Sequence, residues 1–231
     1  MIAVRQVLFS LVLGTSSLSA AQDYTAMEMG SIQLPASPTG AGLPNDGPTL
    51  HKLALFGRCI AEHSGRDILF RPPESQLDRR NLFMNSVAPE ICERIGSFQD
   101  YAPMFLRGSY AERLLLNDFD LTTGKPRERL EKLFPMPTDA QRAKMSEPEK
   151  AALAFVEYGT CIAKMDMPGI ARLMAAEVGS DAELQAFGAL GPAMGQCLAP
   201  GMTLKINRFK LRGYLAEGAY RQLATAQVAS R

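Results

Sequence analysis

Residues 211–217 read Leu-Arg-Gly-Tyr-Leu-Ala-Glu, and residues 106–112 read Leu-Arg-Gly-Ser-Tyr-Ala-Glu. Each string begins fourteen residues after a cysteine, Cys197 or Cys92. Earlier in each half stands another cysteine, and around this pair the residues align as Cys59 with Cys161, Gly57 with Gly159, Ile60 with Ile162, Ala61 with Ala163 and Ile68 with Ile170. A single match arises by chance about one time in ten at ordinary composition. The sequence therefore predicts a tandem duplication, with a three-residue gap between the two cysteine positions.

The four cysteines are read as two copies of one pair. Four cysteines allow three pairings, and the duplication selects the one in which each half closes its own disulfide, Cys59–Cys92 and Cys161–Cys197. Redox-active cysteines usually stand close together, as in Cys-x-x-Cys, and zinc sites use such pairs or clustered histidines. Neither pattern occurs here, so we expect structural disulfides and predict no metal and no cofactor.

Composition and turn residues divide the chain into six segments and predict an all-α fold. Two helical-bundle repeats, each with one internal disulfide, are expected to pack with approximate two-fold symmetry. The segments are a signal peptide at 1–21, a flexible acidic leader at 22–48, repeat one at 49–119, a charged connector at 120–145, repeat two at 146–226 and a tail at 227–231. The leader lacks Lys and Arg and is dense in Pro, Gly, Ser and Thr, a composition that favours disorder.

Repeat two has the clearer helix signals. Ser146 with Glu149, and Ser180 with Glu183, fit the capping box at a helix N-terminus. Together with Asn207 as a further N-cap, they predict four helices, over 151–165, 169–177, from the second capping box through 197, and from 208 to about 225. No strand is expected there. Repeat one should follow the same plan less regularly, because Pro72, Pro73 and Pro89 interrupt it.

The N-terminal segment predicts export. Arg5 supplies a positive charge, residues 7–13 form a short apolar core, and Ser19, Ala20 and Ala21 fit a cleavage site after Ala21. The apolar run is shorter than the roughly 20 residues of a membrane span. Removing Arg5 leaves 24 basic and 24 acidic side chains, a balance that argues against a nucleic-acid partner. We expect a periplasmic or secreted protein without a transmembrane segment after processing.

The repeated string is the candidate functional motif. On a helix, Gly213 and Ala216 share one face between Phe209 and Tyr220, and Gly108 and Ala111 make the matching notch in repeat one. This notch predicts a close helix contact, with the first helix near Gly57 or Gly159 as the expected neighbour. Arg and Glu, five residues apart, lie about 140° around the helix and cannot readily pair with each other. They either orient one helix or repeat against another, or form a duplicated ligand site, with Arg107 and Arg212 holding an anion and Glu112 and Glu217 accepting hydrogen bonds.

Other chemistry is weakly indicated. The two histidines, His51 and His63, are twelve residues apart on one predicted helix, and the sequence lacks the common hydrolase, phosphate-loop, dinucleotide and zinc-protease motifs. A pair of catalytic carboxylates needs geometry rather than a motif, so selecting Glu62, Asp67 or Glu90 would be arbitrary. Met27-x-Met29 and Met165-x-Met167 suggest soft copper ligands, but Met also fills irregular core space. The alternating charges of 125–132 predict a solvated face.

The run CLAPGMTLKINRFKLRGYLAEGAYRQL at 197–223 resembles the C-terminal tail of exported proteins from sphingomonad-type alphaproteobacteria, to which no activity is attached. The resemblance covers mainly repeat two and implies a bacterial, exported protein.

Because the sequence lacks catalytic motifs and is built from a duplicated unit, we expect a non-catalytic binding or protein-interaction protein, whose partner is an envelope protein or a small molecule. Alternatives are a cell-envelope enzyme, such as a hydrolase with carboxylates between the repeats, and a carrier of a small apolar ligand.

Overall fold

The computed structural model describes residues 27–28, 47–63, 92, 94–95, 103–128, 134, 136–199 and 204–229. Helices dominate this part of the chain, as the sequence predicts. They are α1 (Gly47–His63), α4 (Pro103–Asp118), α5 (Asp139–Arg142), α6 (Glu147–Met165), α7 (Met167–Ala175), α8 (Asp181–Gln196) and α9 (Arg208–Ala229). The signal-type segment 1–21 and the expected second and third helices of repeat one lie outside the described residues, apart from Cys92, Arg94 and Ile95.

Two short antiparallel ladders accompany the helices. β1 (Met27–Glu28) pairs with β4 (Lys205–Ile206), and β2 (Phe119–Asp120) pairs with β3 (Lys125–Pro126). The second ladder closes through Gly124, whose positive φ of 69° suits a residue without a Cβ atom. The sequence predicts no strand in repeat two, so β4 is a small correction. It has only two residues, and its partner comes from the predicted leader.

The helix signals of 146–229 are largely confirmed. Ser146 and Glu149 form a capping box at the start of α6, Ser180 caps α8, and Asn207 accepts a hydrogen bond from the Lys210 amide at the start of α9. α7 begins at Met167, two residues earlier than predicted, because Asp166 accepts from the Gly169 amide and caps the helix there. α9 extends to Ala229 instead of ending near Thr225. The short α5 was not predicted, although Thr138 and Gln141 form a capping box before it.

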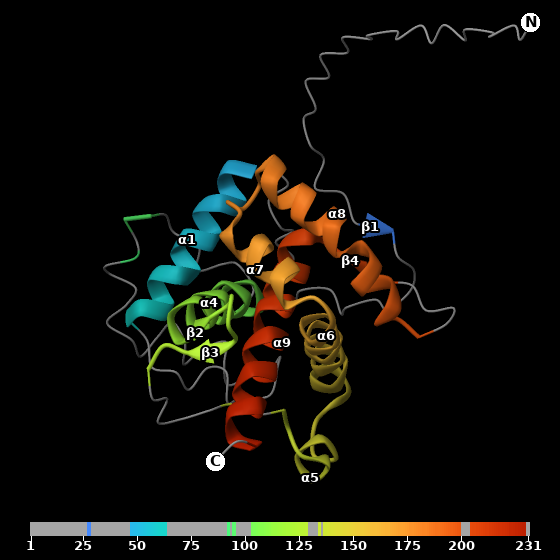
Figure 1. Cartoon of the computed structure of the whole chain (residues 1–231). Coiled ribbons are helices and arrows are strands. Elements are labelled where there is room, and N and C mark those ends of the chain that lie inside the picture. The colour runs from blue at the N-terminus through green and yellow to red at the C-terminus, as the bar shows by residue number, and fades with distance from the viewer. Residues whose placement is uncertain are drawn as a thin grey trace, which may run out of the picture.

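α9 runs through the middle of the molecule, with α6 along one side and α4 along the other, while α1 covers the outer side of α4 (Figure 1). α7 and α8 pack against each other, and α7 also touches α9. Side chains from α1, α4, α6, α7, α8 and α9 belong to one continuous hydrophobic core. The two predicted repeats are therefore joined by a shared core, in which α9 is buried around most of its circumference.

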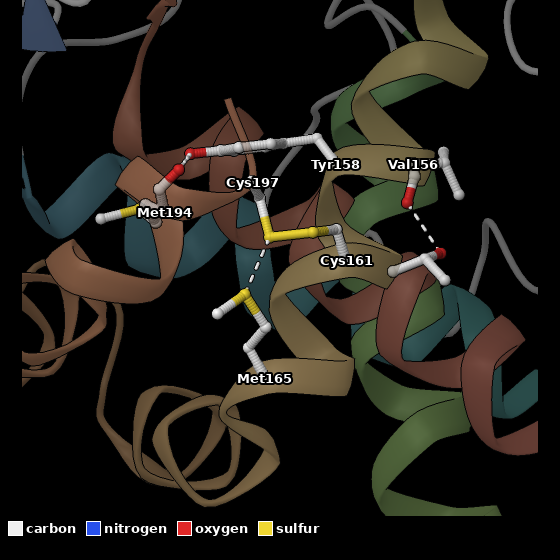
Figure 2. The surroundings of a disulfide bond; sticks show 7 residues. Val156, Tyr158, Cys161, Met165, Met194 and Cys197 are labelled. Atoms are coloured by element: carbon white, nitrogen blue, oxygen red, sulfur yellow. Dashed lines mark hydrogen bonds between the residues drawn. A yellow bond between two sulfur atoms is a disulfide. The ribbon is translucent and has the colours of Figure 1, made fainter. Parts of the chain in front are cut away.

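Both disulfides form as the sequence predicts. Cys59 on α1 is bonded to Cys92, and Cys161 on α6 is bonded to Cys197 at the end of α8. The second bond ties together two helices whose contact is extended by the Tyr158 hydroxyl, which donates to the Met194 carbonyl over 3.0 Å (Figure 2). Burial raises the pKa of Tyr158 to about 12. Each disulfide therefore closes a loop within one half of the chain.

Candidate functional site

The four charged residues of the repeated strings meet where α4 crosses α9. The crossing point is a backbone contact between two glycines: a Cβ atom added to Gly108 would lie 2.7 Å from the Cα of Gly213, and one added to Gly213 would lie 2.6 Å from the Cα of Gly108. Real Cβ atoms do not approach other atoms so closely. The two glycines therefore set the distance between the helices, and they bring Arg and Glu of each string within reach of the other helix.

The first ion pair joins Arg107 of α4 to Glu217 of α9. The Nε and Nη2 atoms of Arg107 each donate to one carboxylate oxygen of Glu217 over 2.8 Å, and Arg221, one turn further along α9, donates to Glu217 over 2.9 Å. Burial alone would raise the pKa of Glu217, but the charges of Arg107 and Arg221, together with their hydrogen bonds, outweigh burial and lower the pKa to about 2. This carboxylate is therefore ionised throughout the physiological range.

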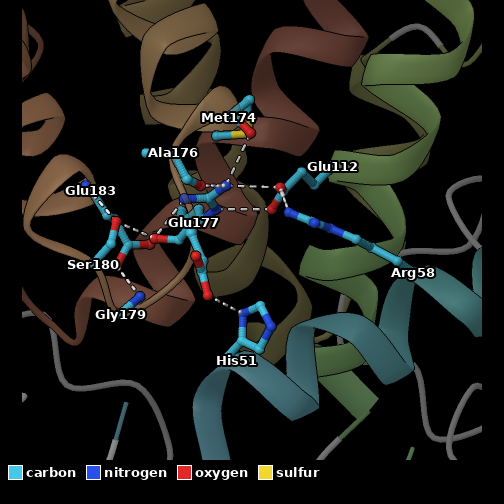
Figure 3. A network of polar contacts seen from close by, with 10 residues as sticks. His51, Arg58, Glu112, Met174, Ala176, Glu177, Gly179, Ser180 and Glu183 are labelled. Carbon is cyan, nitrogen blue, oxygen red and sulfur yellow. Dashed lines mark hydrogen bonds and ion pairs between the residues drawn. The ribbon is translucent and has the colours of Figure 1, made fainter. Parts of the chain in front are cut away.

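The second ion pair repeats the first with the helices exchanged. Arg212 of α9 donates from Nε and Nη2 to the two carboxylate oxygens of Glu112 on α4, over 2.9 and 2.8 Å. Arg58 of α1 approaches the same carboxylate from the other side (Figure 3). Glu112 is thus held between two guanidinium groups, as Glu217 is. The two bidentate pairs lie on either side of the Gly108–Gly213 crossing.

Arg212 has partners beyond Glu112. It also donates to Glu183 over 3.0 Å and to the carbonyl oxygens of Met174 and Ala176 over 3.2 and 3.0 Å. Burial alone would lower the pKa of Arg212, but hydrogen bonds and charge from Glu112 and then Glu183 outweigh it and raise this pKa. With 1 % of its surface exposed, Arg212 connects α4, the end of α7 and the start of α8 through the interior.

Three members of this network, Arg58, Glu183 and Arg221, were not predicted. Glu183 has a sequence signal, since its spacing from Ser180 predicts the second half of a capping box. In the structure the Ser180 hydroxyl accepts from the Glu183 amide, but the Glu183 carboxylate accepts from the Gly179 amide and from Arg212 instead of from the Ser180 amide. Arg58 and Arg221 align with Thr160 and Leu116 in the other half. They are not part of the repeated pattern, and a search for repeated residues therefore misses them.

The predicted neighbour of the glycine notch was wrong in one respect. Gly213 faces Gly108 of α4 rather than the first helix of its own half. Gly159 of that first helix, α6, does pack against α9, but on an adjacent face: a Cβ atom at Gly159 would lie 2.4 Å from the Tyr214 carbonyl oxygen, and one at Gly218 would lie 2.4 Å from the Gly159 carbonyl carbon. α9 has two close helix neighbours and therefore needs glycines on two faces, of which the repeated string supplies one.

The remaining candidates do not join this cluster. His51 lies 3.4 Å from Glu177 at the rim of the network, and Glu62 pairs with Arg113 over 2.5 Å (Figure 3 shows His51). Met165 is exposed, and its sulfur lies 3.5 Å from the Sγ atom of Cys197 (Figure 2). Asp67, Glu90 and Met29 lie outside the described residues. Within the described ranges, no three His, Cys, Asp or Glu residues form a group that could hold a metal ion.

Comparison with known proteins adds no assignment: no protein-family model, curated protein or solved structure matches the chain. Among the helices that the structure describes, none combines the length and the apolar character needed to cross a bilayer. What the crossing can do chemically follows from its own geometry. Charged groups that are buried and held in bidentate pairs fix the relative position of two helices, and their hydrogen-bonding capacity is directed at each other.

Proposed function

We propose that the protein is an exported, non-catalytic interaction protein made of two homologous halves that hold each other through the repeated string. The observation that carries this proposal is the reciprocal pairing at the α4–α9 crossing. Arg107 pairs with Glu217, and Arg212 pairs with Glu112. The only charged motif that occurs twice in the chain is thereby engaged in joining the halves, which supports the structural interpretation of the motif over a duplicated anion site.

The two-fold arrangement supports the duplication. The residues that align in sequence also have equivalent contacts, because exchanging each residue for its counterpart turns the first ion pair into the second and leaves the Gly108–Gly213 contact unchanged. Each half contributes a first helix joined by a disulfide to a cysteine that precedes the repeated string by fourteen residues. α1 packs on α4, and α6 packs on α9. An ancestral unit that paired with itself explains all of these features.

The same geometry argues against a hydrolase whose carboxylates lie between the halves. Two carboxylates at that position, Glu112 and Glu217, are each contacted by two arginines, and a third, Asp118, accepts a hydrogen bond from the Tyr220 hydroxyl. A general acid must hold a proton near the working pH, whereas the pKa of Glu217 is lowered to about 2. Each catalytic carboxyl group of a glycosidase must also reach the substrate, whereas Glu112 and Glu217 are buried.

Export is supported by the signal-type sequence at 1–21, by the resemblance of the C-terminal run to exported bacterial proteins, and by the two disulfides, which fit an oxidising compartment. The first experiment is intact-mass analysis of the protein recovered from the envelope or the medium of an expressing Gram-negative host. We expect Gln22 at the N-terminus and a mass lower by four hydrogens than that of the reduced chain. A retained Met1, or free thiols in the recovered protein, would contradict the proposal.

The second experiment separates an interaction protein from an enzyme. Proximity labelling from the C-terminus of the full chain in the native envelope should enrich a reproducible set of neighbours, compared with the same labelling enzyme exported on its own. Glu112→Gln and Glu217→Gln serve as the catalytic test. We expect both variants to lose thermal stability together with any binding. A variant that keeps its stability and its neighbours but abolishes a hydrolytic activity on envelope material would show that the carboxylate is catalytic.

A further inference from the structure

The α4–α9 crossing has the contact pattern of an interface between two identical partners. In such an isologous interface, if residue i of one partner contacts residue j of the other, then j of the first contacts i of the second. In the alignment, Arg107 corresponds to Arg212, and Glu112 corresponds to Glu217. The crossing satisfies the rule, because Arg107 contacts Glu217 and, with both residues exchanged for their counterparts, Arg212 contacts Glu112. Gly108 contacts its own counterpart, Gly213. The arginine, glycine and glutamate that α4 presents to α9 at the crossing are therefore also present on α9 itself.

We propose that the repeated string is a self-association surface, and that α9 of one molecule can take the place of α4 against α9 of a second copy of this chain. In that dimer Arg212 of each copy would pair with Glu217 of the other, across a Gly213–Gly213 contact. The same holds for α4, where Arg107 would pair with Glu112 of the second copy across a Gly108–Gly108 contact. The inference rests on the crossing geometry alone and is independent of export or of any envelope partner.

Contacts outside the string favour the arrangement within one chain. The Tyr220 hydroxyl donates to Asp118 over 3.0 Å, and the Tyr220 ring meets Phe119 edge-on at 5.5 Å. Tyr220 and Asp118 align with Leu115 and Leu223, so a contact between two α9 helices would lose this hydrogen bond. The linkage in one chain also favours the internal contact, because the two helices are held at a high effective concentration relative to each other. The wild-type chain should therefore close on itself, and a second copy should gain access when the internal crossing is blocked.

Glycine substitutions block the crossing selectively. In Gly108→Leu, a side chain would collide with the Gly213 backbone, so α4 can no longer approach α9, but the face of α9 is unchanged. We expect this full-length variant to form a dimer through α9, seen as a doubling of mass by light scattering at micromolar concentration. Gly213→Leu should form a dimer through α4 by the same reasoning. The double variant Gly108→Leu with Gly213→Leu blocks the α4–α9, α9–α9 and α4–α4 contacts alike and should not form a dimer.

The control and a charge test identify the surface. Gly188→Leu places the same side chain on α8, where an added Cβ atom meets nothing within 4 Å, and should leave the oligomeric state of the wild type unchanged. Adding Glu217→Ala to Gly108→Leu should weaken the dimer at least tenfold. Folded monomers of both single-glycine variants would overturn the proposal, and so would a dimer that persists in the double variant.

A second measurement covers variants that fail to fold. Isotopically light and heavy wild-type chains are unfolded together in denaturant without reductant, refolded at about 100 µM, and analysed by native mass spectrometry. Because both disulfides lie within a half, they do not prevent exchange of halves. Because linkage in one chain favours the internal contact, most wild-type chains should refold as monomers. A detectable minority should form dimers containing one light and one heavy chain, and fewer such dimers should form when both chains carry Gly213→Leu and Gly108→Leu. Recovery of monomers alone from the wild-type mixture would refute self-association through the string.

Discussion

Removing the Arg212 side chain is the most demanding test of the buried network. Arg212→Ala deletes a guanidinium that makes five hydrogen bonds, to Glu112, Glu183 and two backbone carbonyl groups. Glu112 retains Arg58 as a partner, but Glu183 loses the cation that neutralises its buried carboxylate. Removal of one member of a buried ion pair lowers the free energy of unfolding by about 3–5 kcal/mol, because the remaining buried charge is no longer compensated by an opposite charge.

The expected change is large compared with the stability of such a domain. Domains of this size typically unfold at a cost of about 5–15 kcal/mol, and each kcal/mol shifts the melting temperature by about 2–4 °C at 150–250 residues. Arg212→Ala should therefore lower the melting temperature by roughly 6–20 °C. Circular dichroism follows the thermal transition, and urea denaturation of the same samples gives the free energy of unfolding.

The matched control is Lys150→Ala, which removes the cation of an exposed pair with Glu147 on α6. Such surface pairs contribute about 0.3–0.5 kcal/mol, so the control should melt within about 2 °C of the wild type. An Arg212→Ala variant that loses less than about 1 kcal/mol, with an unchanged dependence on urea, would refute the structural interpretation. Unchanged melting combined with loss of a bound partner would instead restore the duplicated ligand site.

Three other predictions test separate parts of the structure. Gly159→Ala should destabilise the protein, because its Cβ atom would lie 2.4 Å from the Tyr214 carbonyl oxygen, whereas Gly188→Ala, in open space, should stabilise it by up to about 1 kcal/mol in urea denaturation. The folded-state pKa of Glu217 is about 2, below its ordinary value of 4.5, so its charge stabilises the folded protein by a free energy on the order of 3 kcal/mol. This stabilisation is complete above pH 4.5 and is lost as the pH falls toward 2. The wild type and Glu217→Gln should therefore differ in stability at pH 7 and converge near pH 2; a constant difference would show that the charge is not involved. Replacing Cys161 and Cys197 by serine opens a loop of 36 residues and should cost roughly 4 kcal/mol, measured as a shift of the urea midpoint.

The sequence predicted the helices of 146–229 and both disulfides because these depend on local or repeated signals. A capping residue such as Ser146 acts within its own turn, and a duplicated cysteine spacing identifies its partner without knowledge of the fold. α5 shows the limit of this reasoning, since Thr138 and Gln141 carry the same capping signal but lie in a stretch that reads as a charged connector. The composition of that stretch predicts a solvated connector, whereas the local capping signal forms a short helix there.

The candidate site could be located from the sequence but not assembled. The repeated string identified Arg107, Glu112, Arg212 and Glu217, and their spacing excluded pairing within one helix. Which helix each would face depends on the crossing of α4 and α9, and this crossing is set by glycine contacts between residues about a hundred positions apart. Arg58 and Glu183 were missed for the same reason, since their roles arise only where α1 and α8 approach the crossing.

The arrangement of charges explains how the crossing keeps one register. The Gly108–Gly213 contact already opposes a slide by one turn, because a residue with a Cβ atom would then replace one of the glycines where the backbones touch. The charged residues add a second penalty. A slide of four residues in one direction would bring Arg107 opposite Arg221 and leave Glu112 opposite Ala216, and a slide in the other direction would place Arg107 opposite Gly213. Either shift strands a buried charge at a cost of about 3–5 kcal/mol. Buried pairs contribute little net stability compared with apolar side chains of similar size, but here every neighbouring register is penalised. The glycines set the distance between the halves, and the ion pairs together with the Gly108–Gly213 contact set their alignment.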